Sequence, residues 1–377
     1  MKILFRADAS IEIGAGHIMR CMVLAEELKN QGADCTFVCR NNQGNLIKKI
    51  QDQGFLVSSI ECRSPKSALE DSNEVINLRA HNSSCLNEGF DAEQTIAAVS
   101  GQYFDWIVVD HYNLSKNWEV LVKPICSRLM VIDDLANRRH NCDLLLDQNY
   151  YNSPDKRYQD LLPTHCVSLL GPNYVLLRQE FIETKKNLII RSGEIKKILV
   201  LFGGGDPTNE TKKILIALSQ IALKRVGVDV VVGGANPHRQ TIYSMCNEIK
   251  GVSYYCDVSN VSELILRADL GIGAGGSSMW ERCYLGLPSI TSVVAFNQIE
   301  TTEDVSSLGV IDYLGRAEML SPDKYATAIL KLIANPAYLK SMSTSGVNLV
   351  SRIGTSSVVD VMQKLSCEAI NNYTAQT

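Results

Sequence analysis

The chain has 377 residues and a net charge of -4, and 45% of its residues are hydrophobic while 21% are charged. This length exceeds what one hydrophobic core usually supports, so two domains are expected. The acidic balance excludes a basic surface for nucleic acid, and the lack of an apolar run of 18 or more residues excludes a membrane span. We expect a cytoplasmic protein with no nucleic acid or membrane partner, and a monomer is favoured.

The twelve cysteines form no C-x-x-C pair and do not cluster with histidines at the spacing of a zinc site. Free thiols, buried or half-buried, are therefore expected, and no structural metal. The opening residues, MKILFRADAS, hold too short an apolar stretch for a secretory signal, and they predict a first strand instead.

The first half begins with a strand-like run, KILFRAD, followed by a glycine-rich turn and the amphipathic segment HIMRCMVLAEELKNQG. The second half repeats this order in KKILVLFGGGDPTNETKKILIALSQI. Further short apolar runs follow each opening, at 35–40, 104–112, 129–134 and 142–149 in the first half and at 226–234, 252–258, 269–276 and 288–294 in the second. Apolar runs that alternate with helical segments predict parallel sheets covered by helices.

The predicted fold class is α/β, with two Rossmann-like doubly wound domains at residues 1–185 and 186–377. Residues 61–95 are expected to form an irregular helical insertion, and the region after Pro322 a C-terminal helical extension. Ligands of such folds bind outside the carboxyl ends of the strands. Functional residues are therefore expected directly after strands, facing a central cleft between the domains.

The first strand-end loop contains Gly14, Gly16 and His17 at the start of a predicted helix. The glycines permit a tight turn and a close approach of a ligand to the backbone. A helix N-terminus disfavours the imidazolium form, so His17 is expected to be neutral and able to accept a proton; the alternative is that it only packs there. A dinucleotide site is disfavoured, because the third glycine is missing and Arg40 stands where an acidic residue is required.

The triplet Asp110, His111 and Tyr112 comes at the end of the apolar strand WIVV. Polar residues at the mouth of a buried strand are poorly explained by packing. Asp110 is a candidate to orient His17 or a water, and Tyr112 to donate a hydrogen bond or to stack. The alternative is a solvated turn, and His111 by itself is expected to be structural.

The second half has three corresponding loops. The loop 202–207, FGGGDP, offers the amide of Gly204 to a phosphate or sugar hydroxyl, with Thr208 or Asn209 capping the next helix. The alternative is a tight turn that lets the domains approach. Asn297, after the strand SITSVVA, offers an amide for sugar hydroxyls or an acetamido group, and alone it would be part of a polar turn.

The third of these loops, GAGGSSMWE, places Gly275, Gly276, Ser277 and Ser278 at a helix N-terminus. Their amides and hydroxyls suit a diphosphate without any lysine. Glu281 lies about one turn into that helix, where a carboxylate suits the two hydroxyls of a ribose. An acidic residue near a helix start is also favoured by the helix dipole alone.

Together these motifs resemble one family, the UDP-2,4-diacetamido-2,4,6-trideoxy-β-L-altropyranose hydrolases of pseudaminic acid biosynthesis. The resemblance runs from residue 1 to about residue 310. It is carried by FRADASIEIGAGHIMR, VVDHYNLS, IDDLANRRHNCDLLLDQN, GPNYVLLRQEF, FGGGDPTN, GAGGSSMWE and FNQIE. It implies a GT-B fold and hydrolysis of the anomeric C–O bond of a UDP-sugar with inversion, without metal or cofactor.

The resemblance also implies roles for individual residues. His17 would activate the attacking water, and Tyr112 and Asn297 would line the sugar pocket. The helix that carries Ser277, Ser278 and Glu281 would hold the diphosphate and ribose of UDP. Arg178, in the segment LLRQEF, would either face the site or tie the domains together.

Two other functions remain open at this point. A GT-B glycosyltransferase with a UDP-amino-sugar donor would share the donor site but would need an acceptor surface, which residues 61–95 could supply. A non-catalytic UDP-sugar binding protein would keep residues 275–281 but would have no use for His17 and Tyr112.

Overall fold

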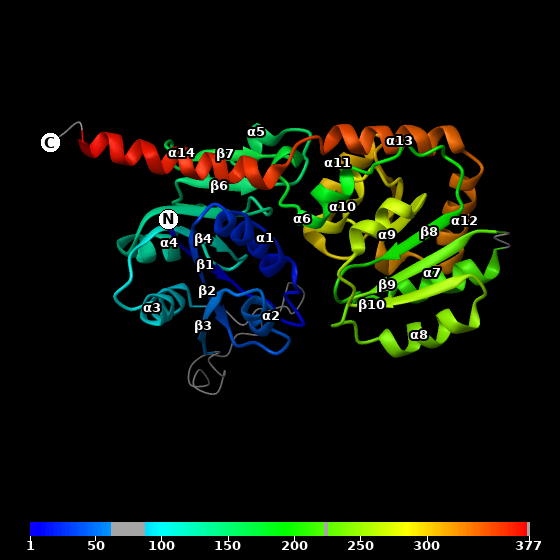
Figure 1. Cartoon of the computed structure of the whole chain (residues 1–377), viewed down its shortest axis with the longest axis horizontal. Coiled ribbons are helices and arrows are strands. Elements are labelled where there is room, and N and C mark those ends of the chain that lie inside the picture. Colours follow the sequence, from blue (N-terminus) through cyan, green and yellow to red (C-terminus); the bar gives the residue numbers. More distant parts are fainter. Residues whose placement is uncertain (62–86, 222–224, 375–377) are drawn as a thin grey trace, which may run out of the picture. The chain divides into compact units, whose positions relative to one another are not determined.

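The computed structural model describes residues 1–61, 87–221 and 225–374, with side chains described as far as residue 368 (Figure 1). Its contacts group the chain into two compact units. The first unit comprises Met1–Leu146, Tyr158–Ser168 and Leu365–Thr377, and the second comprises Asp147–Arg157 and Leu169–Lys364. Each unit is thus assembled from segments distant in the chain, and a functional boundary at residue 185 stays a prediction.

The first unit is built on a seven-stranded sheet in the order β3-β2-β1-β4-β5-β6-β7. The strands are β1 (Lys2–Ala7), β2 (Asp34–Arg40), β3 (Leu56–Ile60), β4 (Phe104–Asp110), β5 (Cys126–Ile132), β6 (Leu144–Asp147) and β7 (Val167–Leu170). The pairs from β3 to β6 are parallel. The strand order reverses between β1 and β4, where the register pairs Ala7 with Asp110. The carboxyl ends of these two strands are therefore the expected ligand position of this sheet.

The helices of the first half connect these strands (Figure 1). They are α1 (Gly16–Asn30), α2 (Ile47–Asp52), α3 (Glu88–Ala98), α4 (Lys116–Val122) and α5 (Pro154–Arg157), with a short 3-10 turn at Lys123–Ile125. A 3-10 turn at Pro172–Tyr174 and α6 (Gln179–Lys185) follow β7 and lead to the second sheet, and α5 and α6 group with the second unit. Of the predicted insertion at 61–95, residues 62–86 lie outside the described residues, and α3 begins directly after them.

The second unit is built on a six-stranded, fully parallel sheet in the order β10-β9-β8-β11-β12-β13. The strands are β8 (Lys197–Leu201), β9 (Gly227–Val232), β10 (Val252–Cys256), β11 (Leu270–Ala274), β12 (Ser289–Val293) and β13 (Asp312–Arg316). Here the order reverses between β8 and β11. The loops that follow β8 and β11 are the glycine-rich loops that the sequence singles out.

Helices cover both faces of this second sheet, as the predicted buried strands require. They are α7 (Glu210–Gln220), α8 (Arg239–Glu248), α9 (Val261–Arg267), α10 (Ser277–Tyr284), α11 (Ile299–Ser307), α12 (Pro322–Ile333) and α13 (Pro336–Leu349), with 3-10 turns η4 (Phe296–Gln298) and η5 (Ala317–Met319). Alternate residues of β8 enter different clusters: Ile198 and Val200 pack with α7 and α12, while Leu199 and Leu201 pack with α9 and α10. Both faces of the strand are therefore core.

The C-terminal region forms helices as predicted. Helices α12 and α13 belong to the second unit, whereas α14 (Gly354–Thr374) begins in the second unit and its last part groups with the first. In the first unit, Trp106 Nε1 donates to Ser366 Oγ at 2.8 Å.

The start of α7 corrects one expectation. Neither Thr208 nor Asn209 caps this helix through its side chain. Instead the buried carboxylate of Asp206 accepts from the backbone amides of Glu210 at 2.8 Å and Thr211 at 3.0 Å. A carboxylate satisfies two amides at once and suits the positive end of the helix dipole, which a single hydroxyl or amide oxygen does less well.

Three further findings concern the described part of the chain. Every cysteine in it is a free thiol, as expected. No helix within residues 1–61, 87–221 or 225–374 has the length and apolar character that crossing a bilayer requires. Nor does any group of three or more His, Cys, Asp or Glu side chains assemble there in a way that could hold a metal ion.

Arg191 joins two helix ends in the second unit. Its buried guanidinium donates to the carbonyls of Ile265, Ala268, Leu285 and Gly286, at the C-termini of α9 and α10, over 2.6–2.8 Å. Burial lowers the pKa of Arg191 to about 10, so the group stays charged at neutral pH. A cation is favoured at the negative end of a helix dipole, and here it serves two helices.

Arg191→Met is expected to lower the free energy of unfolding of the second unit by about 2–4 kcal/mol, because it leaves buried carbonyls without a donor. Urea denaturation followed by fluorescence measures this change. The matched control is Arg267→Met, at an exposed position of α9, which is expected to shift stability by less than about 0.5 kcal/mol. Equal stability of the two variants would contradict the assigned role.

Candidate functional site

The site in the first unit centres on the end of β4. Asp110 is fully buried there, and its Oδ1 lies 2.5 Å from Nδ1 of His17. Arg20 donates to both oxygens of the same carboxylate, through Nε to Oδ2 at 2.5 Å and through Nη2 to Oδ1 at 2.7 Å. His17 and Arg20 lie three residues apart in the first turns of α1, so both project from one face of the helix. The structure therefore brings together two of the predicted residues, and adds Arg20.

The charge on Asp110 decides what His17 can do. Burial by itself raises the pKa of the Asp110 carboxyl, but Arg20 and, to a smaller extent, His17 outweigh this and hold that pKa well below its usual range. An ionised carboxylate only accepts hydrogen bonds, so Nδ1 of His17 must be the donor. In a neutral ring this leaves Nε2 as the acceptor nitrogen.

Tyr112 lies against the same histidine. Its ring packs edge-on against the His17 ring, with centroids 4.4 Å apart. Burial and the neighbouring Asp134 carboxylate raise the pKa of the Tyr112 phenol, so it remains a hydrogen-bond donor at neutral pH. Asp134 in turn pairs with Arg20 Nη1 at 3.1 Å. Tyr112, Asp134 and Arg20 thus surround the His17–Asp110 pair.

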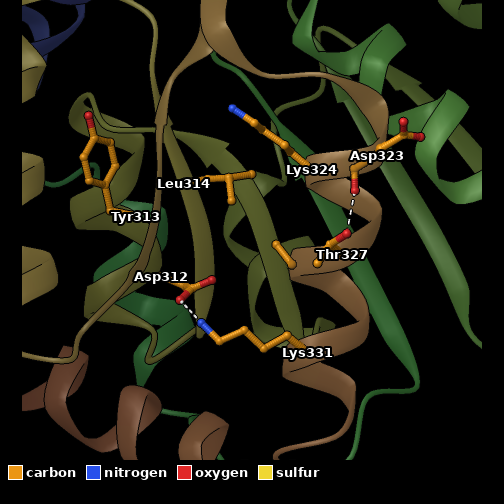
Figure 2. A pocket seen from close by; sticks show the side chains of 8 residues that line it. Asp312, Tyr313, Leu314, Asp323, Lys324, Thr327 and Lys331 are labelled. Atoms are coloured by element: carbon orange, nitrogen blue, oxygen red, sulfur yellow. Dashed lines mark hydrogen bonds and ion pairs between the residues drawn. The ribbon is translucent and has the colours of Figure 1, made fainter.

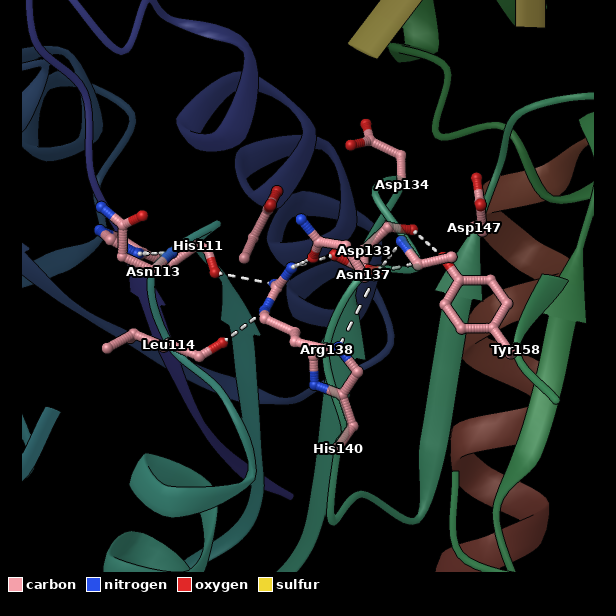
Figure 3. A network of polar contacts seen from close by, with 12 residues as sticks. His111, Asn113, Leu114, Asp133, Asp134, Asn137, Arg138, His140, Asp147 and Tyr158 are labelled. Carbon is pink, nitrogen blue, oxygen red and sulfur yellow. Dashed lines mark hydrogen bonds and ion pairs between the residues drawn. The ribbon is translucent and has the colours of Figure 1, made fainter. Parts of the chain in front are cut away.

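A polar network beneath this site fixes the loop that carries Tyr112 (Figure 3). Arg138 donates to the carbonyls of His111 at 3.1 Å and Leu114 at 2.9 Å, on either side of Tyr112. Its Nη1 pairs with Asp133 Oδ1 at 2.7 Å, and Asp133 Oδ2 also accepts from the Tyr158 hydroxyl at 3.2 Å. The loop after β5 therefore anchors the loop after β4.

His140 continues the network on its buried side. Its Nδ1 lies 2.6 Å from Glu119 Oε1, and its Nε2 faces Asp133 Oδ2 at 3.8 Å. Burial lowers the pKa of His140, but the two carboxylates more than compensate and leave it raised above its usual value. The motif IDDLANRRH thus forms a charged scaffold rather than a second catalytic group.

His111 is structural, as expected. Its Nδ1 accepts from the Asn113 amide at 3.1 Å, and its Nε2 lies 3.3 Å from Asp8 Oδ2. Burial lowers the pKa of His111 and keeps the ring neutral. Asp8 is bound mainly by Arg6, whose guanidinium is fully buried and also pairs with Asp91.

The loop between β1 and α1 leaves free space around two of its glycines. Gly14 has φ +80°, which favours glycine, and both Gly14 and Gly16 have no heavy atom within 4 Å of the position that a Cβ would take. A side chain would therefore be tolerated at Gly16 by its neighbours, and the free space there suits a ligand approaching the amides at the start of α1.

In the second unit, the loop from β11 to α10 has the expected place at a helix N-terminus. Gly275 lies against Thr302, since a Cβ there would sit 2.3 Å from Thr302 Oγ1, and Gly276 lies beside the amide of Gln298. Asn297 precedes Gln298 in η4, so the β12 loop and the β11 loop adjoin each other. Ser277 is exposed and Ser278 half-buried at the first positions of α10.

Glu281 and Arg178 form a pair within the second unit. Arg178 Nη2 donates to Glu281 Oε1 at 3.0 Å, and Arg178 also pairs with Glu180. Burial raises the pKa of Glu281, and Arg178 opposes this only in part. Arg178 thus holds the carboxylate that the sequence assigns to a ribose, a contact that the sequence alone did not predict.

The backbone of Gly204 lies against Gly233, and this contact requires a glycine at position 233. A Cβ at Gly233 would lie 2.4–2.7 Å from the Gly204 backbone, so the loops after β8 and β9 are in direct contact. This contact accounts for the glycine at position 233 without any ligand. The role of Gly204 in binding stays a prediction.

A hollow elsewhere in the second unit lies between β13 and α12 (Figure 2). Lys331 pairs with Asp312 across it at 3.2 Å, and Thr327 donates to the Asp323 carbonyl at 2.9 Å. None of the predicted site residues lines it. It therefore offers no competing candidate for the site.

The sequence identified His17, Asp110 and Tyr112 but missed Arg20 and Asp134. The spacing of His17 and Arg20 on one helix face was a usable signal, because only α1 can aim both at the end of β4. Asp134 follows β5 just as Asp110 follows β4, so its position at a strand end was a second signal.

Two parallel sheets, each covered by helices and carrying its polar loops at the carboxyl ends of its strands, define the GT-B class of fold. MurG from Acinetobacter baumannii matches 96% of this chain and 99% of its own, with a TM-score of 0.63 at 12% identity. The UDP-GlcNAc 2-epimerase from Neisseria meningitidis, solved with UDP-GlcNAc bound, matches 97% of this chain and 100% of its own, with a TM-score of 0.61 at 13% identity. The predicted fold class is confirmed.

Comparison of the amino-acid sequence finds curated relatives of this chain. The chain is 26% identical over 265 residues to UDP-2,4-diacetamido-2,4,6-trideoxy-beta-L-altropyranose hydrolase of Campylobacter jejuni, a match that covers 70% of this chain and 81% of the relative. It is 27% identical over 300 residues to the uncharacterized protein MJ1062 of Methanocaldococcus jannaschii, which covers 77% of this chain but only 55% of that relative. No family model matches the chain. The resemblance inferred from the motifs is confirmed by the first of these relatives.

The buried carboxylates of the first unit predict acid sensitivity. Burial raises the pKa values of Asp8, Asp110 and Asp133, but the charged partners of each outweigh it and set the folded-state values below those of the unfolded chain. The stability they contribute is therefore fully present above about pH 4, the usual pKa of an unfolded aspartate, and is lost as pH falls below it.

Asp8→Asn tests this directly. At pH 7 the variant should be less stable than the wild type by roughly 2–4 kcal/mol, and the difference should shrink toward pH 3, because the unfolded wild type then binds a proton on Asp8 that the folded state, with its lowered pKa, does not bind. Denaturant titrations from pH 3 to 8 measure it, with the exposed Asp52→Asn as control. A difference that stays constant with pH would contradict the ionised pairing of Asp8.

Proposed function

We propose that this protein is an enzyme that hydrolyses a UDP-activated diacetamido-trideoxy hexose to the free sugar and UDP, in the biosynthesis of pseudaminic acid. Water attacks the anomeric carbon with inversion, without a metal or cofactor. The name of the Campylobacter relative supports the substrate class. The observation that carries the mechanism is the buried His17–Asp110 pair at the carboxyl ends of β1 and β4.

Asp110 holds Nδ1–H of His17, so Nε2 takes a proton from the attacking water. The water oxygen forms a bond to the anomeric carbon while the bond from that carbon to the β-phosphate oxygen breaks. The electron pair of that bond leaves with UDP, which departs as an anion and needs no acid. Tyr112 donates a hydrogen bond to the sugar or the water, and Arg20 keeps Asp110 ionised throughout.

The second unit supplies the nucleotide site in this proposal. The amides at residues 276–278 and the hydroxyls of Ser277 and Ser278 stabilise the charge that grows on the β-phosphate. Gly275, whose own amide donates to the Ser292 carbonyl at 3.1 Å, lies beside them. Glu281, held by Arg178, accepts from the ribose hydroxyls.

The remaining predicted residues frame the substrate. Asn297 binds the sugar through its amide. Gly14 and Gly16 leave free space for the substrate at the start of α1, although the Gly14 amide itself donates to the Ser10 carbonyl. Gly204 presents its amide beside the loop after β11. Each of these assignments is open to single substitution.

His17→Phe is expected to lower turnover at least a thousandfold, within the range that loss of a general base produces, while UDP still binds. Its matched control, His165→Phe, changes an exposed histidine and should leave turnover unchanged. The assay follows the anomeric protons of UDP-diacetamido sugars by NMR, which reports the bond broken and the stereochemical course together.

Free sugar and UDP must appear from the wild type without any acceptor. Turnover only in the presence of an acceptor would favour a GT-B glycosyltransferase, and UDP-sugar binding without turnover would favour a binding protein. Near-normal turnover by His17→Phe would remove His17 from the mechanism.

A further inference from the structure

Arg282 is a buried arginine in α10 that pairs with no carboxylate of the described residues. Its side chain is 1% exposed, and its acceptors are uncharged oxygens. Nε donates to Ser289 Oγ at 3.0 Å, Nη2 to the Ala274 carbonyl at 2.9 Å, and Nη1 to Ser278 Oγ at 3.2 Å. Burial lowers the pKa of Arg282 only to about 10, so the guanidinium is charged at neutral pH.

The strand β11 is shaped around this side chain. A Cβ at Gly273 would lie 2.8 Å from Arg282 Nη1, and a Cβ at Gly271 would lie 3.0 Å from Arg282 Cδ. Both glycines have their Cβ direction on the same face of the strand, because alternate residues share a face. The glycines of DLGIGAGG thus make room for a guanidinium beneath the loop that starts α10.

Its position is electrostatically unfavourable for the protein alone. Side chains in a helix point back toward its N-terminus, and Arg282 accordingly reaches Ser278 and Ala274 at the start of α10. That end of the helix already carries positive partial charge, so the dipole and the guanidinium repel each other. A buried charge is costly unless it is paired. No carboxylate of the described residues supplies a balancing negative charge, whereas an anion bound at the loop 274–278 would.

Ser278 connects the buried charge with the surface. Its oxygen accepts from Arg282, so its own proton is available to an acceptor on the other side. The side chain is half-buried, which leaves it accessible. Arg282 therefore determines the direction in which this hydroxyl donates.

We infer that Arg282 is a positioning residue of the anion site at residues 274–278: it orients the Ser278 hydroxyl as a donor toward a nucleotide phosphate and supplies the permanent positive charge that retains that phosphate. This rests on the proposed function, because the anion is taken to be the diphosphate of UDP. The charge acts on the phosphates and not on the uridine. Arg282 should therefore matter for UDP and not for a nucleoside.

The experiment compares the dissociation constants of UDP and of uridine, measured by ligand-observed NMR and calorimetry, for the wild type and five variants. Arg282→Met is expected to weaken UDP binding about tenfold to a hundredfold, with uridine binding unchanged within about twofold. Arg282→Lys keeps the charge but loses the planar fork, so it should recover part of the loss. Arg267→Met, on the surface of α9, is the control and should behave as the wild type.

Ser278→Ala keeps the measurement decisive if Arg282→Met fails to fold, since it removes a single half-buried hydroxyl and leaves the guanidinium in place. It should weaken UDP binding, and in the double variant Ser278→Ala/Arg282→Lys the two effects should be less than additive, because both act through one hydrogen bond. Strict additivity, or equal loss of UDP and uridine affinity, would mean that Arg282 only supports the fold of α10.

The outcomes distinguish a failure of the proposed function from a failure of the inference about Arg282 alone. A wild type that fails to bind UDP overturns the proposed function and with it this inference. A wild type that binds UDP while all Arg282 and Ser278 variants bind it equally well overturns this inference alone.

Discussion

The ionised carboxylate of Asp110, buried between His17 and Arg20, is the interaction on which the first unit's chemistry depends. Without Arg20 the carboxyl would be a buried acid with a raised pKa, and a protonated carboxyl would not define the tautomer of His17. With it, the imidazole has one nitrogen occupied and one free. The guanidinium reaches Asp110 because it lies one helix turn from His17, so the geometry of α1 provides both residues at once.

The two units differ in the charged groups that they place at the carboxyl ends of their strands. Both sheets reverse strand order next to their first strand, and both place polar loops at that point. In the first unit, carboxylates at the strand ends are matched by arginines, and the charges are satisfied internally. In the second, Arg282 lies beneath the loop after β11 and donates only to uncharged oxygens, and we propose that a ligand supplies the balancing charge. One unit is thereby suited to proton transfer and the other to holding an anion.

The sequence was informative where residues are buried on both faces. Strands such as β4 and β8 appear as continuous apolar runs, and their polar successors marked the site. The strands it missed, β3, β7 and β13, are all edge strands of their sheets and are only partly buried, as in β13 with DYLGR. Their pairing is decided by the neighbouring strand rather than by an apolar run.

Side-chain contacts between segments that lie far apart in the chain could not be predicted from the sequence either. Arg178 lies 103 positions from Glu281 in the chain, and Arg20 lies 114 positions from Asp134. The glycines of these loops also differ in their surroundings. At Gly14 and Gly16 the space that a Cβ would take is open, whereas at Gly233, Gly271 and Gly273 it is filled by backbone or by side chains such as Arg282. A glycine-rich motif therefore located the loops, but it could not tell a ligand from an internal neighbour.

The most direct measurement of the central claim is the tautomer of His17, obtained from the nitrogen-15 spectrum of the histidine-labelled protein at neutral pH, with Asp110→Asn as the reference. The account predicts that Nδ1 of His17 carries the proton and Nε2 is unprotonated, and that this preference is lost when the carboxylate is replaced. A wild-type ring protonated on Nε2 alone would contradict the account, because no acceptor nitrogen would then remain for the water.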